Sequence, residues 1–254
     1  MQQPRFSSRR SETLVASGVT NVLFDCDGTL VDSETIAFRE CTGFINRLLT
    51  QKSCNLQFSP KDLQAQFLGV SFHGIVASLS KAYSFPITPD ELATLAKEEE
   101  MHVITALRRE VQPCDEVPAT VQQLAETGMV LSVVSSSSLP RIEACLEKTD
   151  LAAYFPPERI FSCVTSLPRP ESKPSPAVYI HALRKLGIRA CDAVAVEDSV
   201  NGTLAAVNAG LSVIGYIGSH SDPRDRDAHG DRLASAGARA IVSRFSDIPD
   251  LISQ

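Results

Sequence analysis

Six short apolar runs, separated by helical patterns, constrain the fold of this chain more than any other feature of its sequence. Apolar residues at helical spacing, such as Tyr179, Ala182, Leu183 and Leu186, lie between neighbouring runs. Strands that alternate with helices in this way are typical of a parallel sheet. The sequence therefore predicts an α/β fold with a Rossmann-like, doubly wound parallel sheet. The predicted strands are residues 19–24, 129–134, 160–164, 193–196, 212–217 and 240–243.

Two segments near these runs have clear local signals. The helix before the fourth run can be capped by Ser175, suits Pro176 in its first turn and can end at Gly187. Residues 218–231 are rich in Asp, Arg and Ser, and we interpret them as a solvated surface loop.

One long segment, between the first and second runs, interrupts the alternation. Ile45, Leu48 and Leu49 share one helical face there, Ser33 can cap the first helix, and strand signals are few. A crossover of this length far exceeds the usual connection. We therefore predict an all-helical insertion with hinges near residues 31–33 and 111–113. The predicted domains are a disordered tail (1–18), an α/β core (19–32 and 113–254) and a helical insertion (33–112).

Composition and charge narrow the classes of partner. The net charge of −6 argues against nucleic acid or an anionic membrane as the default partner. No apolar run approaches the roughly 20 residues that a membrane span needs. Seven cysteines without a CxxC pair favour reduced thiols, so we expect a cytoplasmic protein. The first eleven residues carry three arginines and no acid, and we expect a disordered tail there rather than a targeting signal.

Two carboxylates follow the first predicted strand, in Asp25-Cys26-Asp27-Gly28. Because side chains alternate along a strand, Asp25 and Asp27 can start on the same side of the chain. Gly28 then permits a sharp turn. Open α/β sheets bind ligands at the carboxyl ends of their strands, so we interpret the pair as part of a site. For the pair alone, a solvated Asp-Gly turn is an equal alternative.

Three later segments place polar groups at the ends of predicted strands or just before a predicted helix. Ser135 ends the second strand, and its hydroxyl with the following backbone N–H groups can cradle an anion. Lys173 supplies a cation just before the helix with clear caps. Glu197 and Asp198 end the fourth strand, where acids are costly unless a cation pairs with them. Mg²⁺ suits such a place, because it binds carboxylates together with phosphate oxygens.

In their order along the chain, these segments resemble the four motifs of the haloacid dehalogenase superfamily of phosphotransferases. The resemblance covers residues 19–251, and the helical insertion looks like the C1 cap of that family. It implies a Mg²⁺-dependent phosphoric monoester hydrolase that acts on a small phosphorylated metabolite. The matching residues are Asp25-Cys26-Asp27-Gly28-Thr29, Ser135, Lys173 and Glu197-Asp198.

The resemblance also implies a role for each of these residues. Asp25 is expected to attack phosphorus and form an aspartyl phosphate. Asp27 is expected to protonate the leaving oxygen and then to activate water. Ser135, Ser136 and Lys173 are expected to bind the phosphoryl oxygens, with Ser135 and Lys173 stabilising the transition state. The implied metal ligands are Asp25, Asp27 through its backbone carbonyl, Glu197 and Asp198.

Substrate choice is expected to depend on the cap. Its segments look most like the branch that contains 6-phosphogluconate phosphatases, so we predict a sugar, sugar-acid or polyol phosphate as substrate. A monomer or weak dimer is expected. The predicted specificity residues are Glu34, Gly69, Val70, Ser71 and His73.

Two alternatives stay open. The first is a mutase similar to β-phosphoglucomutase. That family has a histidine where this chain has Ala37, and basic residues in the cap loop where it has Leu68 and Phe72. A bisphosphorylated intermediate would therefore lack its basic partners here. The second is a non-catalytic sensor of phosphate ligands, for which Asp27 would not be required.

Overall fold

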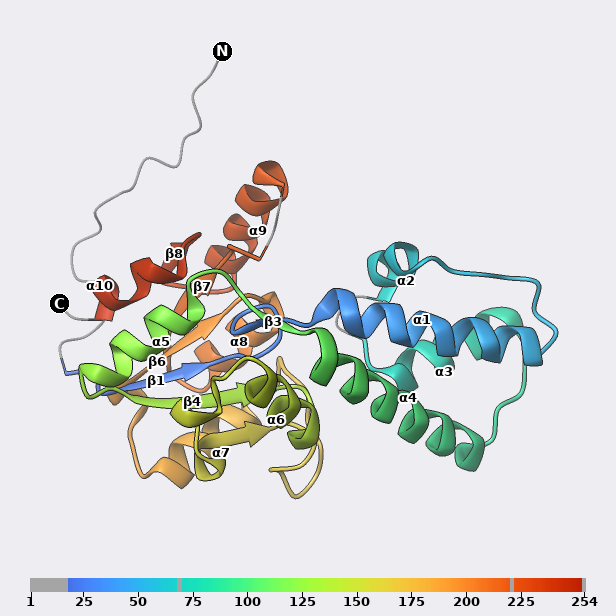
Figure 1. Ribbon diagram of the computed structural model, residues 1–254, viewed down its shortest axis with the longest axis horizontal. Coiled ribbons are helices and arrows are strands. Elements are labelled where there is room, and N and C mark those ends of the chain that lie inside the picture. The colour runs from blue at the N-terminus through green and yellow to red at the C-terminus, as the bar shows by residue number, and fades with distance from the viewer. Residues whose placement is uncertain (1–17, 68–69, 220–221, 253–254) are drawn as a thin grey trace, which may run out of the picture.

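The core of the protein is a six-stranded parallel sheet. The computed structural model describes residues 18–67, 70–219 and 222–252. The strand order is β5-β4-β1-β6-β7-β8, and every neighbouring pair is parallel (Figure 1). The sheet grows from β1 in both directions, which is the doubly wound arrangement predicted from the sequence. The strands are β1 (Asn21–Phe24), β4 (Val130–Ser135), β5 (Ile160–Ser162), β6 (Ala193–Glu197), β7 (Ser212–Tyr216) and β8 (Ala240–Val242).

Helices pack on both faces of this sheet, because side chains alternate along each strand. Val22 and Phe24 of β1 belong to one hydrophobic cluster, which includes residues of α5, α6 and α10. Leu23 belongs to another, which includes residues of α7 and α8. The helices of the core are α5 (Val117–Glu126), α6 (Leu139–Lys148), α7 (Ala177–Leu186), α8 (Val200–Asn208), α9 (Pro223–Ser235) and α10 (Ile248–Ile252).

Four helices lie beside the sheet and form the long insertion (Figure 1). They are α1 (Glu34–Gln51), α2 (Pro60–Phe67), α3 (Phe72–Tyr83) and α4 (Pro89–Glu110). They share a hydrophobic cluster of their own, which includes Ile45, Leu63 and Val76. We propose that these helices are a cap over the core. The exact predicted domain boundaries stay a prediction.

The two connections to the insertion pair with each other. The short strands β2 (Val31–Asp32) and β3 (Gln112–Pro113) are antiparallel. Both fall in the segments where the sequence predicts hinges. The chain therefore leaves and re-enters the core at one place, next to the end of β1.

Two local predictions were wrong. The segment interpreted as a loop contains most of α9, which begins after Asp222, whose side chain accepts a hydrogen bond from the Arg224 backbone N–H. That helix buries only His229, Gly230 and Leu233, so it has no apolar stripe to find in the sequence. The N-cap of α7 is Pro176, and Ser175 lies one position earlier.

Some sequence predictions fall on parts of the chain that lie outside the described residues. These parts include residues 1–17, which make up most of the predicted tail, and residues 68–69 of the insertion. Among the described residues, no helix is both long and apolar enough to cross a membrane.

Candidate active site

The carboxyl ends of three neighbouring strands bring the predicted catalytic residues together. β1 lies between β4 and β6 in the sheet. Asp25 directly follows β1, Ser135 is the last residue of β4, and Glu197 is the last residue of β6. The Asp25 backbone N–H donates a hydrogen bond to the Val196 carbonyl oxygen at 2.9 Å, which ties the end of β1 to β6. Because the strands are parallel, residues that are far apart in the sequence lie together in one polar site.

Lys173 joins these strand ends through its ammonium group. Its Nζ lies 2.5 Å from Asp25 Oδ1, 2.6 Å from Glu197 Oε1 and 2.8 Å from the Val134 carbonyl oxygen. The residue is buried, with 8% of its surface exposed. Burial would lower the pKa of Lys173, but the charges of Asp25 and Glu197 outweigh that effect and hold it well above the ordinary lysine value. Lys173 is therefore a fixed positive charge at the site.

Three carboxylates form a cluster that fits a divalent cation. One oxygen from each of Asp25, Glu197 and Asp198 lies within 4.8 Å of the others, and we call these residues the carboxylate cluster. Fully ionised, they carry a formal charge of −3, which the single charge of Lys173 reduces to −2. All the donors are hard carboxylate oxygens, which Mg²⁺ prefers. The charge and chemistry of the cluster therefore match Mg²⁺.

The turn after β1 lets Asp198 approach closely. Gly28 has a φ of +79°, a left-handed conformation that glycine adopts without strain. A Cβ atom at this position would lie 2.3 Å from Asp198 Oδ2. The Thr29 hydroxyl donates a hydrogen bond to Asp198 Oδ1 at 3.2 Å. A glycine at position 28 is thus required for Asp198 to share the site with Asp25.

Burial and crowding disfavour the ionised forms of Asp25 and Asp198. Burial raises the pKa of Asp25 to about 8, against the opposing charge of Lys173 and with help from the charge of Glu197. Burial, followed by the charges of Asp25 and Glu197, raises the pKa of Asp198 well above its ordinary value. The single positive charge of Lys173 therefore does not neutralise the negative charge of the carboxylate cluster. A bound cation would favour the ionised form of all three carboxylates.

Asp27 lies in a different environment from Asp25. Its Oδ2 accepts hydrogen bonds from Ser137 Oγ at 2.7 Å and from Ser135 Oγ at 3.4 Å, and its Oδ1 accepts one from Ser33 Oγ. Burial would raise the pKa of Asp27, but the charge of Arg141 and these hydrogen bonds hold it below the ordinary value. The two aspartates are thus pushed in opposite directions, as expected for a pair with different roles.

The predicted specificity residues are less clearly placed. Glu34, at the start of α1, is half-buried, and burial followed by the charge of Asp27 raises its pKa. Val70, Ser71 and His73 are exposed at the start of α3. In residues 70–73 the structure shows no hydrogen bond to the catalytic groups, and Gly69 lies outside the described residues.

The serine segment differs in one respect from the prediction. Ser136, predicted to bind phosphate, is exposed, and its hydroxyl lies 3.9 Å from Cys163 Sγ. The next residue, Ser137, contacts Asp27 through its hydroxyl and Ser135 through its backbone N–H. Sequence reasoning did not single out Ser137, although the run of four serines contained the signal.

Three other residues of the site were also missed. Tyr179 of α7 donates a hydrogen bond to Glu197 Oε1 at 2.7 Å. Ser33 has the N-cap position of α1, but its hydroxyl makes no cap bond and turns to Asp27 instead. Arg141 of α6 acts on Asp27 through its charge. The apolar stripe that predicted α7 includes Tyr179, so only its hydroxyl distinguished it from a core residue.

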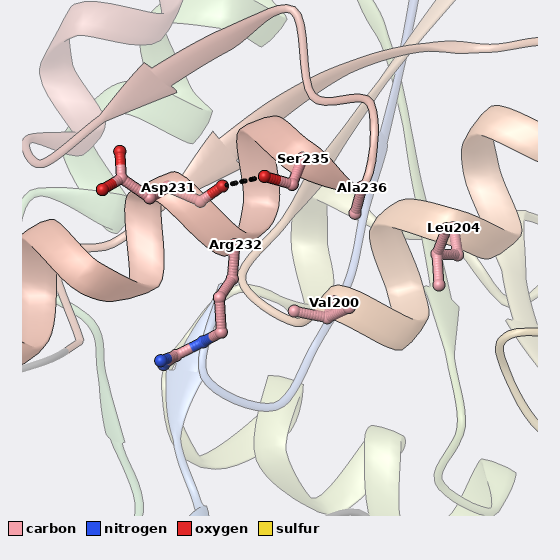
Figure 2. Close-up of a pocket in the computed structure, with 6 residues that line it drawn as sticks. All are labelled: Val200, Leu204, Asp231, Arg232, Ser235 and Ala236. Carbon is pink, nitrogen blue, oxygen red and sulfur yellow. Dashed lines mark hydrogen bonds between the residues drawn. The ribbon is translucent and has the colours of Figure 1, made fainter.

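A pocket lies away from these groups. Figure 2 shows it between α8 and α9, with a volume of about 430 Å³. None of its lining residues belongs to the site predicted from the sequence. The lining residues are Val200, Leu204, Asp231, Arg232, Ser235 and Ala236.

A buried acid at the junction of the cap helices and the core predicts a pH effect on stability. Glu99 of α4 is 7% exposed, and burial raises its pKa to about 7, although the charge of Arg141 opposes the rise. An acid whose pKa is raised in the folded state stabilises that state below its unfolded pKa, and this contribution is lost as pH rises through the folded pKa. Glu99 therefore destabilises the fold above about pH 7.

Replacing Glu99 by Gln should remove this dependence. Relative to the unaltered protein, the free energy of unfolding of Glu99→Gln should rise between pH 5 and pH 8 by on the order of 2 kcal/mol. Denaturant unfolding at several pH values measures the difference. Glu98→Gln, at an exposed position of the same helix, is the matched control and should show no such trend. A constant difference for Glu99→Gln across this range would contradict the prediction.

Comparisons with known proteins agree with this geometry. A sequence model described as haloacid dehalogenase-like hydrolase matches residues 19–210. The chain is 26% identical over 212 residues to 6-phosphogluconate phosphatase of Escherichia coli K12, covering 83% of this chain and 86% of that protein. A solved structure of a haloacid dehalogenase-like protein of unknown function from Agrobacterium tumefaciens is 33% identical, with a TM-score of 0.71, and the match covers 93% of this chain and 98% of that one.

A second solved structure supports the fold alone. It is CbbY of Rhodobacter sphaeroides in complex with phosphate, which is 22% identical with a TM-score of 0.73 over 93% of this chain and 100% of that one. The family match spans β1 to the end of α8, which includes every residue of the carboxylate cluster. The chain belongs to the haloacid dehalogenase-like hydrolase family.

Proposed function

We propose that this protein is a Mg²⁺-dependent phosphatase that hydrolyses a small phosphorylated metabolite through an aspartyl phosphate on Asp25. The observation that carries the proposal is the convergence of Asp25, Ser135, Lys173 and the other carboxylates at the ends of β4, β1 and β6. Family membership supports a hydrolase, and the name of the E. coli relative supports a phosphate ester as substrate.

In the first step, a carboxylate oxygen of Asp25 attacks phosphorus, a new O–P bond forms, and the bond to the leaving oxygen breaks. When bound, Mg²⁺ supplies positive charge that lets an anionic aspartate meet an anionic phosphate. Lys173, fixed by three contacts, and the hydroxyl of Ser135 bind the phosphoryl oxygens and stabilise the charge of the transition state.

Asp27 acts as general acid in the first step and as general base in the second. In the free protein its carboxylate accepts hydrogen bonds from three serine hydroxyls and is ionised. A phosphate that takes up the hydroxyl of Ser135 removes one of these donors and adds negative charge nearby, and both changes raise the pKa of Asp27. As its pKa rises, Asp27 takes up a proton from solvent, and it then donates this proton to the leaving oxygen. In the second step it takes a proton from the water that attacks phosphorus and releases Asp25.

Phosphate release is the direct test of this function. The purified chain should release phosphate from p-nitrophenyl phosphate, and faster from at least one ester among 6-phosphogluconate, a hexitol phosphate, phosphoglycolate and a pentose phosphate. Release should stop in chelator and return with added Mg²⁺. If no compound is hydrolysed with metal present, a phosphate-ligand sensor is favoured. If glucose 1-phosphate is converted into glucose 6-phosphate without net phosphate release, the mutase is favoured.

A further inference from the structure

Arg141 is a basic residue at the junction between the cap helices and the core. It lies in the first turn of α6, three residues after the serine run that follows β4. α6 packs against α4 of the insertion, so its first turn lies between the two parts of the protein. The hydroxyl of Ser138, at the N-cap of α6, donates a hydrogen bond to Glu100 of α4 across this junction.

Acidic groups from several elements surround this arginine. Its charge acts on Asp27 after β1, on Glu99 and Glu100 of α4, and on Glu34 of α1. The strongest of these charges on the guanidinium is that of Asp27. Arg141 therefore lies near Asp27 of the site and near acids of α1 and α4.

The hydrogen-bonding capacity of Arg141 is not used by the described residues around it. Its Nε is buried and has no hydrogen-bond partner among them. A buried donor without a partner costs free energy. A guanidinium presents a rigid fork of donors that matches a carboxylate or a phosphate. The missing partner is thus expected to be a small anion that enters from outside the chain.

The proposed role of Asp27 indicates which part of the substrate would carry this anion. In the proposed reaction Asp27 protonates the leaving oxygen, so the leaving moiety extends from Asp27 toward the cap. We propose that Arg141 binds an anionic group on the leaving moiety and selects substrates that carry one. The inference rests on the proposed phosphatase function and specifies its substrate class.

The local charge favours a carboxylate over a second phosphate. Glu34, Glu99 and Glu100 are all near Arg141, and they oppose the entry of a dianion more than that of a monoanion. A sugar-acid phosphate is therefore the expected substrate class. A sugar bisphosphate, whose second phosphate could also contact Arg141, is less favoured.

The test compares substrates that differ at the group Arg141 would bind. The ratio of kcat/KM for 6-phosphogluconate to that for glucose 6-phosphate is measured for the unaltered chain, Arg141→Met and Arg141→Lys, with glucose 1,6-bisphosphate as a third substrate. Arg141→Met should lower the 6-phosphogluconate ratio by about 10- to 100-fold, because one charge-assisted hydrogen-bonded contact is lost. Arg141→Lys should lie between, since it keeps the charge without the fork. Lys148→Met, which removes an exposed charge from the same helix, should keep the ratio.

A binding measurement separates this inference from the proposed function. Titration calorimetry on Asp25→Asn, with and without Arg141→Met, compares binding of 6-phosphogluconate and glucose 6-phosphate in the absence of turnover. A preference for 6-phosphogluconate that Arg141→Met abolishes would support the inference even if no ester were hydrolysed. Equal losses for both ligands would show that Arg141 only supports Asp27 or the cap, and would overturn it. In the kinetic comparison, a selective loss for glucose 1,6-bisphosphate alone would overturn the choice of a carboxylate.

Discussion

The Asp25→Asn variant should fold and bind ligand, but it should lose phosphate release by at least about 10⁴-fold, as variants without their nucleophile do. An amide cannot form the aspartyl phosphate, and no neighbouring group can replace it as nucleophile. The carboxylates of Glu197 and Asp198 are the nearest acids, but Glu197 is held by Lys173 and Tyr179, and Asp198 accepts from Thr29. The loss should appear in kcat, because the missing interaction belongs to the chemical step.

The fold should tolerate this substitution well. Burial raises the pKa of Asp25 to about 8, so a neutral group at this position relieves the crowding of the cluster. We therefore expect the midpoint of thermal unfolding to stay within about 4 °C of that of the unaltered chain, which corresponds to roughly 1 kcal/mol. Lys173 keeps its contacts to Glu197 and to the Val134 carbonyl oxygen.

Two measurements make the Asp25 prediction specific. Acid quenching during turnover, followed by mass spectrometry of peptides, should find a phosphoryl group on the peptide with Asp25 in the unaltered chain and none in the variant. Asp115→Asn, at an exposed position before α5, is the matched control and should retain turnover. Turnover of Asp25→Asn within about tenfold of the unaltered chain, with deamidation excluded by mass, would rule out this nucleophile.

The strands of this fold could be predicted from the sequence because each is a short apolar run that is separated from the next run by a helical pattern or a long insertion. All six predicted strands are present in the sheet, and their parallel order places Asp25, Ser135 and Glu197 at one edge. Most of the catalytic residues predicted from the sequence lie at or directly after the end of a strand. Lys173 comes from a loop, and only its place before α7 made it visible.

The contacts missed by the sequence arise from tertiary packing. Ser33 had the local signal of a helix cap, but the turn after β1 brings its hydroxyl to Asp27. Arg141 resembled an ordinary polar residue in the first turn of a helix, and its position among acids of α1 and α4 depends on how the insertion docks. α9 was missed because a helix rich in charge and short of apolar residues has no periodic pattern to detect.

The Lys173→Met variant is expected to lose stability as well as activity. Met keeps the length of the side chain but leaves Asp25 and Glu197 without their shared cation. Removing one partner of a buried ion pair costs about 3–5 kcal/mol, because the remaining charge stays buried. The loss, measured by denaturant unfolding in chelator, should be larger at pH 8 than at pH 6, since burial raises the pKa of Asp25 to about 8 and protonation of Asp25 removes its charge at lower pH. Activity should fall by about 10²–10³-fold, as when one donor that stabilises transition-state charge is removed.

Added Mg²⁺ should compensate this variant more than it stabilises the unaltered chain. The ammonium of Lys173 repels a cation at the carboxylate cluster, so its removal should strengthen binding, and a cation that binds only the folded state raises the midpoint of unfolding. Lys173→Met/Glu197→Gln should recover part of the stability in chelator, because no unpaired charge is left at Glu197 while an amide can still accept the hydrogen bond from Tyr179. Lys185→Met, at an exposed position of α7, is the control. If Lys173→Met were as stable as Lys185→Met in chelator at pH 8, Lys173 would not be the charge that holds the carboxylates of β1 and β6 together.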